Sequence, residues 1–204
     1  MSPTARARSA PTAKEDRRQE LVLAAFNQIA ARGFEGLRTR DVAAEVGLNI
    51  ATLHYYFPTK EALIRGVVEE AMRRFRLTLE PHGSPADQLH THLRAVRQLL
   101  RTDPKLRAVM GELALRSARD QAIAGILRGT NDAWYKTLRG LLRRAAKGGH
   151  LRPDLDTDDV AALIVAALTS MMLPTVSKAD RVDQTFRQLE RMLGVSGRTG
   201  STLS

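Results

Sequence analysis

Hydrophobic residues recur along this chain with the period of an α-helix almost from end to end. Val22, Ala25, Phe26 and Ile29 stand at i, i+3, i+4 and i+7, which places their side chains on one face of an amphipathic helix. No segment has a convincing strand pattern. The pattern therefore predicts an all-α fold with about nine helices.

Capping residues set the expected boundaries of these helices. Asn49 and Thr59 are preferred N-caps, and Ser84 and Asp103 each precede a proline that suits the first helical position. Thr39 is the expected N-cap of the second helix, and Thr12 with Glu15 resembles a capping box before the first. The expected helices cover residues 12–33, 40–46, 50–57, 60–79, 85–100, 104–118, 120–147, 157–173 and 179–193.

Composition narrows the class of protein. The chain has 204 residues and no cysteine, which removes disulfides, thiolate metal sites and cysteine nucleophiles. Its longest uncharged run, residues 160–177, contains Pro174 and is too short in apolar residues for the roughly 20 that span a bilayer. We therefore expect a cytoplasmic protein with no membrane partner.

The charge balance favours a polyanionic partner only weakly. The net charge is +10, which suits nucleic acid. Residues 61–153 hold eighteen Lys and Arg against nine Asp and Glu, whereas residues 1–60 hold nine against six. Most of the excess thus lies away from the segment with the most distinctive residues.

That segment is VGLNIATLHYYFPTKEAL, residues 46–63. Ala43 and Gly47 have the spacing of a helix-turn-helix, in which a small residue lies where two helices cross and a glycine tolerates the turn. Helix 50–57 would then enter the major groove with its N-terminal residues nearest the bases. The alternative is that the aromatic run at 55–57 is simply core.

Each exposed residue of this unit has a plausible contact. The methyl-bearing side chains of Ile50 and Ala51 would touch thymine methyl groups. Thr52 would contact a base edge or a phosphate, and Tyr55 a phosphate. Lys60 starts a helix whose free N–H groups also favour a phosphate. The predicted DNA-binding residues are Thr39, Arg40, Asn49, Ile50, Ala51, Thr52, His54, Tyr55 and Lys60.

The stretch TRDVAAEVGLNIATLHYYFPTKEALI resembles the DNA-binding segment of TetR-family transcriptional regulators. The resemblance implies a homodimer that binds a palindromic operator and releases it when a small molecule enters the C-terminal body. Two residues depart from the family pattern: His54 replaces the usual tyrosine, and Ile50 replaces a commonly polar residue. The positions that usually contact DNA correspond to Thr39, Thr52, Tyr55 and Lys60.

The domain organisation follows from these elements. We expect a disordered arm at 1–13, a helix-turn-helix domain at 14–60, an effector-binding and dimerisation domain at 61–194, and a disordered tail at 195–204. Arg6 in the arm would reach the minor groove or remain solvated.

Helix 157–173 is apolar on nearly all sides and must be covered on every face. A two-fold four-helix bundle with helix 179–193 of two chains would cover it, and a monomeric core is the alternative. The predicted dimer interface comprises Ala162, Ala166, Ser170, Val182, Phe186 and Leu189.

Residues unlike a standard Leu/Ala core mark an expected effector pocket, for which core packing is the alternative. Methionine adapts to irregular ligands, and Trp and Tyr give flat apolar walls, so a mainly apolar effector is expected. His90 and His92 point apart on a helix, so no metal or cofactor is expected. The predicted pocket residues are Phe75, His92, Val96, Met110, Leu113, Arg116, Trp134, Tyr135, Leu138, Met171 and Met172.

These features favour a ligand-responsive DNA-binding regulator, with repression as its expected activity and double-stranded DNA, a small molecule and a second copy as its partners. The alternative is a non-catalytic architectural DNA-binding protein without an effector. No nucleophile–base pair or phosphate loop indicates an enzyme.

Overall fold

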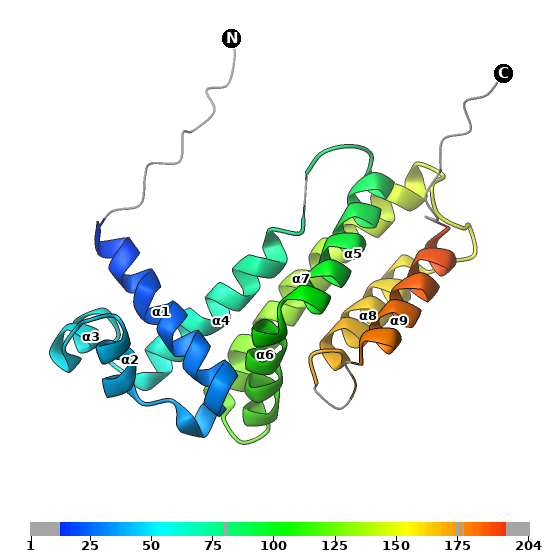
Figure 1. The fold of residues 1–204 in the computed structure, drawn as a ribbon. Helices are drawn as coiled ribbons and strands as arrows, with labels where there is room; N and C mark the ends of the chain where they lie inside the picture. The colour runs from blue at the N-terminus through cyan, green and yellow to red at the C-terminus, as the bar shows by residue number, and fades with distance from the viewer. Residues whose placement is uncertain (1–12, 80, 174–175, 177, 195–204) are drawn as a thin grey trace, which may run out of the picture.

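A computed structural model describes residues 13–79, 81–173, 176 and 178–194 of the chain. These residues form nine α-helices and a short 3-10 helix and contain no strand (Figure 1), so the all-α prediction is confirmed. The helices are α1 (Ala13–Arg32), η1 (Phe34–Gly36), α2 (Thr39–Glu45), α3 (Ile50–Tyr56), α4 (Lys60–Arg76), α5 (Pro85–Thr102), α6 (Pro104–Ser117), α7 (Gln121–Lys147), α8 (Thr157–Ser170) and α9 (Ala179–Leu193).

Two sets of predictions fall outside the described residues. They are the capping role of Thr12, with the arm that carries Arg6, and the tail at 195–204. Ala13, the last residue assigned to the arm, is already helical. No helix in the described ranges is long and apolar enough to cross a membrane.

Most of the predicted helix starts are confirmed by hydrogen bonds from the expected caps. The side chains of Asn49, Thr59 and Asp103 accept from backbone N–H groups three residues on, at 2.8, 3.1 and 2.9 Å. Ser84 forms a reciprocal capping box with Asp87. Four helices therefore begin where local side chains satisfy the free N–H groups of the first turn.

Three boundaries were wrong. Arg38 rather than Thr39 is the N-cap of α2 and makes no side-chain cap, because a guanidinium has no acceptor for the free N–H groups of the first turn. It donates instead to the Glu35 carbonyl at 2.5 Å. α4 ends three residues before the expected position 79, where the Thr78 hydroxyl donates to the Phe75 carbonyl at 2.6 Å. α8 ends at Ser170 rather than residue 173, and the chain continues as a turn.

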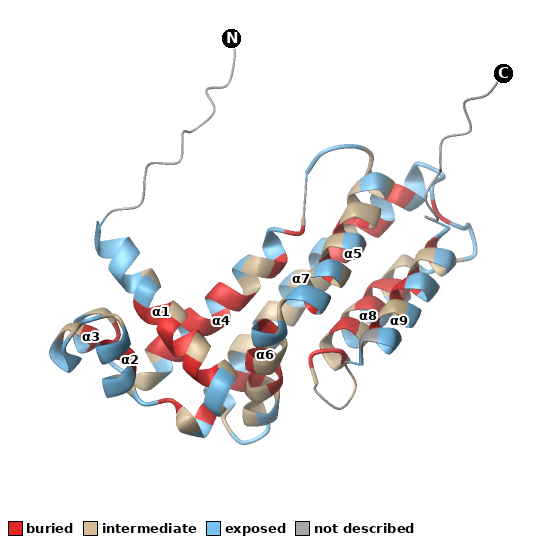
Figure 2. Ribbon diagram, viewed as in Figure 1, coloured by how far each residue is buried: buried red, intermediate tan, exposed pale blue. Residues whose placement is uncertain are grey.

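The head consists of α1, α2 and α3, and the body is built from α5 to α9 (Figure 1). α4 joins the two parts, since it packs against α1 at one end and against α7 at the other. α7 is the longest helix and contacts α4, α5, α6 and α8. Buried residues continue from the head through α4 into the body (Figure 2), so the core is a single cluster.

A charged cluster fastens the middle of α4 to its neighbours. Glu70 is 3% exposed and accepts from Gln19 of α1 at 2.9 Å, from Arg73 at 2.8 Å and from Arg74 at 3.0 Å. Arg74 also reaches Asp103, the cap of α6, at 2.5 Å. Burial alone would raise the pKa of Glu70, but these donors outweigh it and lower that pKa to about 2. The carboxylate is therefore ionised at neutral pH and holds three helices together.

Candidate nucleic-acid interface and ligand cavity

The turn between α2 and α3 has the geometry of a helix-turn-helix. Ala43 is 1% exposed where the helices pack. Gly47 has φ +69°, a conformation that side chains with a Cβ adopt at a cost. The N–H groups of Gly47 and Leu48 donate to the carbonyls of Ala44 and Ala43, at 3.1 and 2.8 Å. These bonds close the end of α2 and fix the direction in which α3 leaves.

α3 has a buried face and an exposed face. Leu53 is fully buried, and Phe57 directly after the helix is 2% exposed, so both anchor the helix to the head. Ala51 and His54 are exposed, and Tyr55 is 68% exposed. The aromatic run therefore divides: Phe57 belongs to the core, whereas Tyr55 faces solvent, so the run as a whole is not core.

A polar contact holds the N-terminus of α3 before any partner binds. The Asn49 side-chain oxygen accepts from the Thr52 backbone N–H at 2.8 Å and from the Thr52 hydroxyl at 3.0 Å. The hydroxyl proton is thus committed to Asn49. Thr52 retains lone pairs that accept from a donor such as the amino group of adenine or cytosine.

Tyr55 is held by a residue of α1. The Lys14 ammonium lies 3.1 Å from the Tyr55 hydroxyl and 5.0 Å from its ring centre. The hydrogen bond to Tyr55 raises the pKa of Lys14. This pair places a fixed positive charge beside a phenol on the exposed side of α3.

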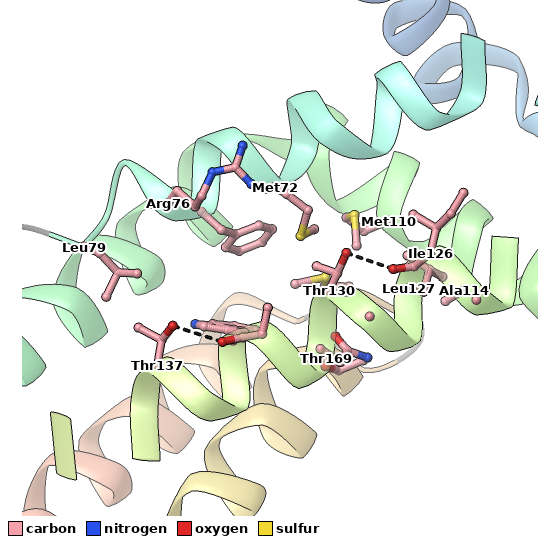
Figure 3. A pocket seen from close by; sticks show the side chains of 17 residues that line it. Met72, Arg76, Leu79, Met110, Ala114, Ile126, Leu127, Thr130, Thr137 and Thr169 are labelled. Carbon is pink, nitrogen blue, oxygen red and sulfur yellow. Dashed lines mark hydrogen bonds between the residues drawn. The ribbon is translucent and has the colours of Figure 1, made fainter. Parts of the chain in front are cut away.

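A cavity of about 410 Å³ lies in the body between α4, α6, α7 and α8 (Figure 3). Its volume is within the range of small-molecule sites. Phe75 and Trp134 form an aromatic wall with ring centres 5.6 Å apart. Met110 and Met172 are buried side chains of the lining. Within the part of the chain that the structure describes, Arg76 is the one charged residue of the lining.

A buried histidine positions the tryptophan wall. His92 is 0% exposed, and burial lowers its pKa to about 4. Its Nδ1 lies 2.8 Å from the Thr78 hydroxyl, and its Nε2 is 3.2 Å from the Trp134 indole nitrogen. Because Thr78 already donates to Phe75, neutral His92 donates from Nδ1 and accepts from Trp134 at Nε2. The Trp134 indole N–H thus has its hydrogen-bond partner on the side away from the cavity, while the indole ring lines the cavity.

Comparison with known proteins identifies the family to which this arrangement belongs. Residues 21–67 match the family described as bacterial regulatory proteins, tetR family, and residues 79–188 match the tetracyclin repressor-like C-terminal domain. The chain belongs to the TetR family of transcriptional regulators.

Individual relatives agree with this assignment. The nucleoid occlusion factor SlmA of Haemophilus influenzae is 31% identical over 108 residues, which are 51% of this chain and 50% of that protein. The chain therefore spans about half the length of that curated relative. The HTH-type transcriptional repressor KstR2 of Mycolicibacterium smegmatis is 25% identical over 158 residues, covering 76% and 77% of the two chains.

A solved structure is similar over almost the whole fold. A TetR-family regulator from Rhodococcus sp. matches with a TM-score of 0.73 and 22% identity, and the match covers 87% of this chain and 98% of that one. At this identity the similarity shows the fold alone.

The predicted DNA-binding residues of this TetR-family chain all lie on α2, α3, their caps or the first residue of α4, and none is buried. Lys60 is half-buried, and its ammonium lies 5.1 Å from the centre of the Phe34 ring. Lys14 is missing from the sequence-based set. It is 41 residues from Tyr55, so no local pattern links the two.

The predicted pocket residues separate into three groups. Phe75, Met110, Trp134 and Met172 line the cavity. Tyr135 lines a neighbouring hollow beside α8. The other predicted pocket residues do not line the cavity and are His92, Val96, Leu113, Arg116, Leu138 and Met171.

The packing of each helix explains why these predicted residues do not line the cavity. Val96, Leu113 and Leu138 are 0% exposed, because they occupy the core-facing stripes of their helices. Arg116 pairs instead with Glu35 at 2.9 Å and lies 4.8 Å from the Phe34 ring centre. The predicted set lacks Met72 and Arg76 of α4, Leu79 just beyond that helix, and the α7 glycines Gly125 and Gly129. Two glycines one turn apart in a long helix were the available signal.

Part of the predicted dimer interface is corrected by the structure. Val182, Phe186 and Leu189 are at most 4% exposed, because α9 turns its apolar stripe toward its own chain and packs on α5. Ala162 and Ala166 of α8 are exposed, and Ser170 is half-buried. The available surface is therefore the outer face of α8.

Proposed function

We propose that this chain is a dimeric transcriptional repressor whose affinity for a palindromic operator falls when a small, mainly apolar molecule fills the body cavity. The observation that carries the proposal is the exposed face of α3, held by Leu53 and Phe57 and preorganised by Asn49. A helix with a small residue, Ala51, at its leading end suits insertion into the major groove.

The polar residues around α3 are suited to the two kinds of DNA contact. Thr52 accepts from a base edge, whereas Tyr55 and Lys14 together donate to one backbone phosphate. Arg40 and Lys60 add charge-assisted contacts to neighbouring phosphates. The contacts through charged groups make binding salt-dependent.

A dimer would form through α8. Leu163 is 51% exposed and stands between the exposed Ala162 and the exposed Ala166 one turn on. Small residues beside a leucine allow a second helix to approach closely, and a two-fold axis there presents both heads to one duplex. Half-sites one helical turn apart then specify a palindrome.

Ligand control would pass through α4. Met72, Phe75 and Arg76 in its last two turns line the cavity, while Lys60 starts it beside the head. A ligand that fits one position of α4 better than another shifts the population of head spacings. The ligand must distinguish the two positions, since equal affinity for both shifts nothing.

Selection from a pool of random double-stranded DNA, followed by footprinting, tests the proposal. We expect one palindromic consensus and a binding constant that falls steeply with salt. Tyr55→Phe should weaken operator binding about fivefold, the value of one phosphate hydrogen bond, while Thr102→Val, which removes an exposed hydroxyl at the end of α5, serves as the control. Uniform binding to every sequence would instead favour the architectural alternative.

A further inference from the structure

Among the described residues that line the cavity, one carries a positive charge and none carries a negative one. That residue is Arg76, which is exposed. No hydrogen bond or ion pair joins Arg76 to any residue in the described part of the chain. A cationic ligand would be repelled there, whereas an anion would find a guanidinium with donors in a planar fork.

Three other polar side chains that line the cavity, Thr130, Thr137 and Trp134, already donate hydrogen bonds within the protein. The hydroxyls of Thr130 and Thr137 donate to carbonyls of their own helix, Ile126 at 2.9 Å and Ala133 at 3.0 Å (Figure 3). The Trp134 indole N–H is taken by His92. A ligand that offers apolar surface to these walls therefore leaves none of these donors unsatisfied.

The shape of the cavity follows α7. A Cβ added to Gly125 or Gly129 would meet no atom within 4 Å, so neither glycine serves helix packing. Each lowers helix stability by up to about 1 kcal/mol relative to alanine. Together they leave a stretch of one face of α7 without side chains. From Gly125 to Thr137 the lining extends along twelve residues, roughly 18 Å of helix.

We infer that the effector of this cavity is an apolar carboxylic acid, long or flat, whose carboxylate pairs with Arg76 and whose body lies along the bare side of α7. A single guanidinium matches one negative charge, which favours a carboxylate over a doubly charged phosphate. This inference rests on the proposed function and adds the chemical class of its ligand.

Titrations of the full chain with matched acids and alcohols test this assignment. The probes are decanoic acid with 1-decanol, and 2-naphthoic acid with 2-naphthylmethanol, and Trp134, the single tryptophan, reports binding by its fluorescence. In at least one series the acid should bind about tenfold more tightly than the alcohol. Arg76→Gln should remove that preference and leave the affinity for the alcohol unchanged.

Arg128→Gln is the matched control, since Arg128 is exposed on α7 and does not line the cavity; it should keep the preference. Equal affinities of acid and alcohol in the unchanged protein would overturn the inference, and so would the absence of binding by all four probes. Neither result would affect the selection of a palindromic DNA sequence by the head. The DNA selection experiment therefore tests the proposed function independently of these titrations.

Discussion

The proposed DNA-binding surface of the head and the cavity of the body hold their side chains in opposite ways. In the head, Asn49 and Lys14 hold Thr52 and Tyr55 through hydrogen bonds at the surface. In the body, Trp134 is fixed by His92, a histidine that solvent does not reach. A surface site tolerates changes of side chain without unfolding, whereas a buried site couples ligand recognition to the stability of the fold.

The largest effect that would sharpen this contrast is on DNA affinity. Ala51→Glu places a carboxylate at the leading end of α3, where phosphates and base edges crowd it. We expect operator affinity to fall at least about a thousandfold, to the level of non-specific binding, with the urea midpoint unchanged because Ala51 is exposed. Ala118→Glu, exposed at the end of α6, should change neither measurement.

Next in size is the loss of the buried carboxylate between head and body. Glu70→Gln removes the negative charge and one of the two acceptor oxygens that Arg73 and Arg74 share, and we expect the free energy of unfolding in urea to fall by about 3 kcal/mol. Glu69→Gln, whose pair with Arg18 is 3.6 Å long and exposed, should change it by less than about 0.5 kcal/mol. Similar values for both variants would show that the cluster does not fasten α4.

The pH dependence of stability separates the body from the head. The pKa of His92 is lowered to about 4 from an ordinary value of 6.5, so the unfolded chain binds the extra proton first. Neutral His92 therefore contributes up to about 3 kcal/mol to the free energy of unfolding. This contribution is fully present above pH 6.5 and is lost as the pH falls toward 4. Urea unfolding at pH 7 and 4.5 should show a smaller loss in His92→Gln than in the unchanged chain. His82→Gln, an exposed control, should keep the full loss.

The smallest effects come from a pair of glycines, one in each region. Gly47→Ala should destabilise the head by about 1 kcal/mol, because φ +69° strains a residue with a Cβ. Gly129→Ala should stabilise α7 by up to about 1 kcal/mol, while it narrows the cavity. Thermal unfolding measures both, and effects of the same sign would contradict the assigned roles.

The same contrast explains how far the sequence could be interpreted. The helix-turn-helix was predictable because Ala43, Gly47, Asn49 and Thr59 act within a few residues of one another. The full lining of the cavity was not predictable, because it comes from four helices. Whether Leu138 or Thr137 faces the cavity depends on the rotational orientation of α7 relative to α4. Arg76 was not predicted because the sequence alone does not distinguish it from Arg73 and Arg74. The structure does, since those two donate to Glu70.

Glu70 has a mechanical consequence. Its hydrogen bonds hold α4 at a point ten residues from Lys60, about 15 Å along the helix axis, and six residues from Arg76, about 9 Å along the axis. A rod pivoting at that point multiplies motion by the ratio of its arms. A sideways push of about 1 Å at the cavity end would thus swing the head end by roughly 1.7 Å, in the opposite direction.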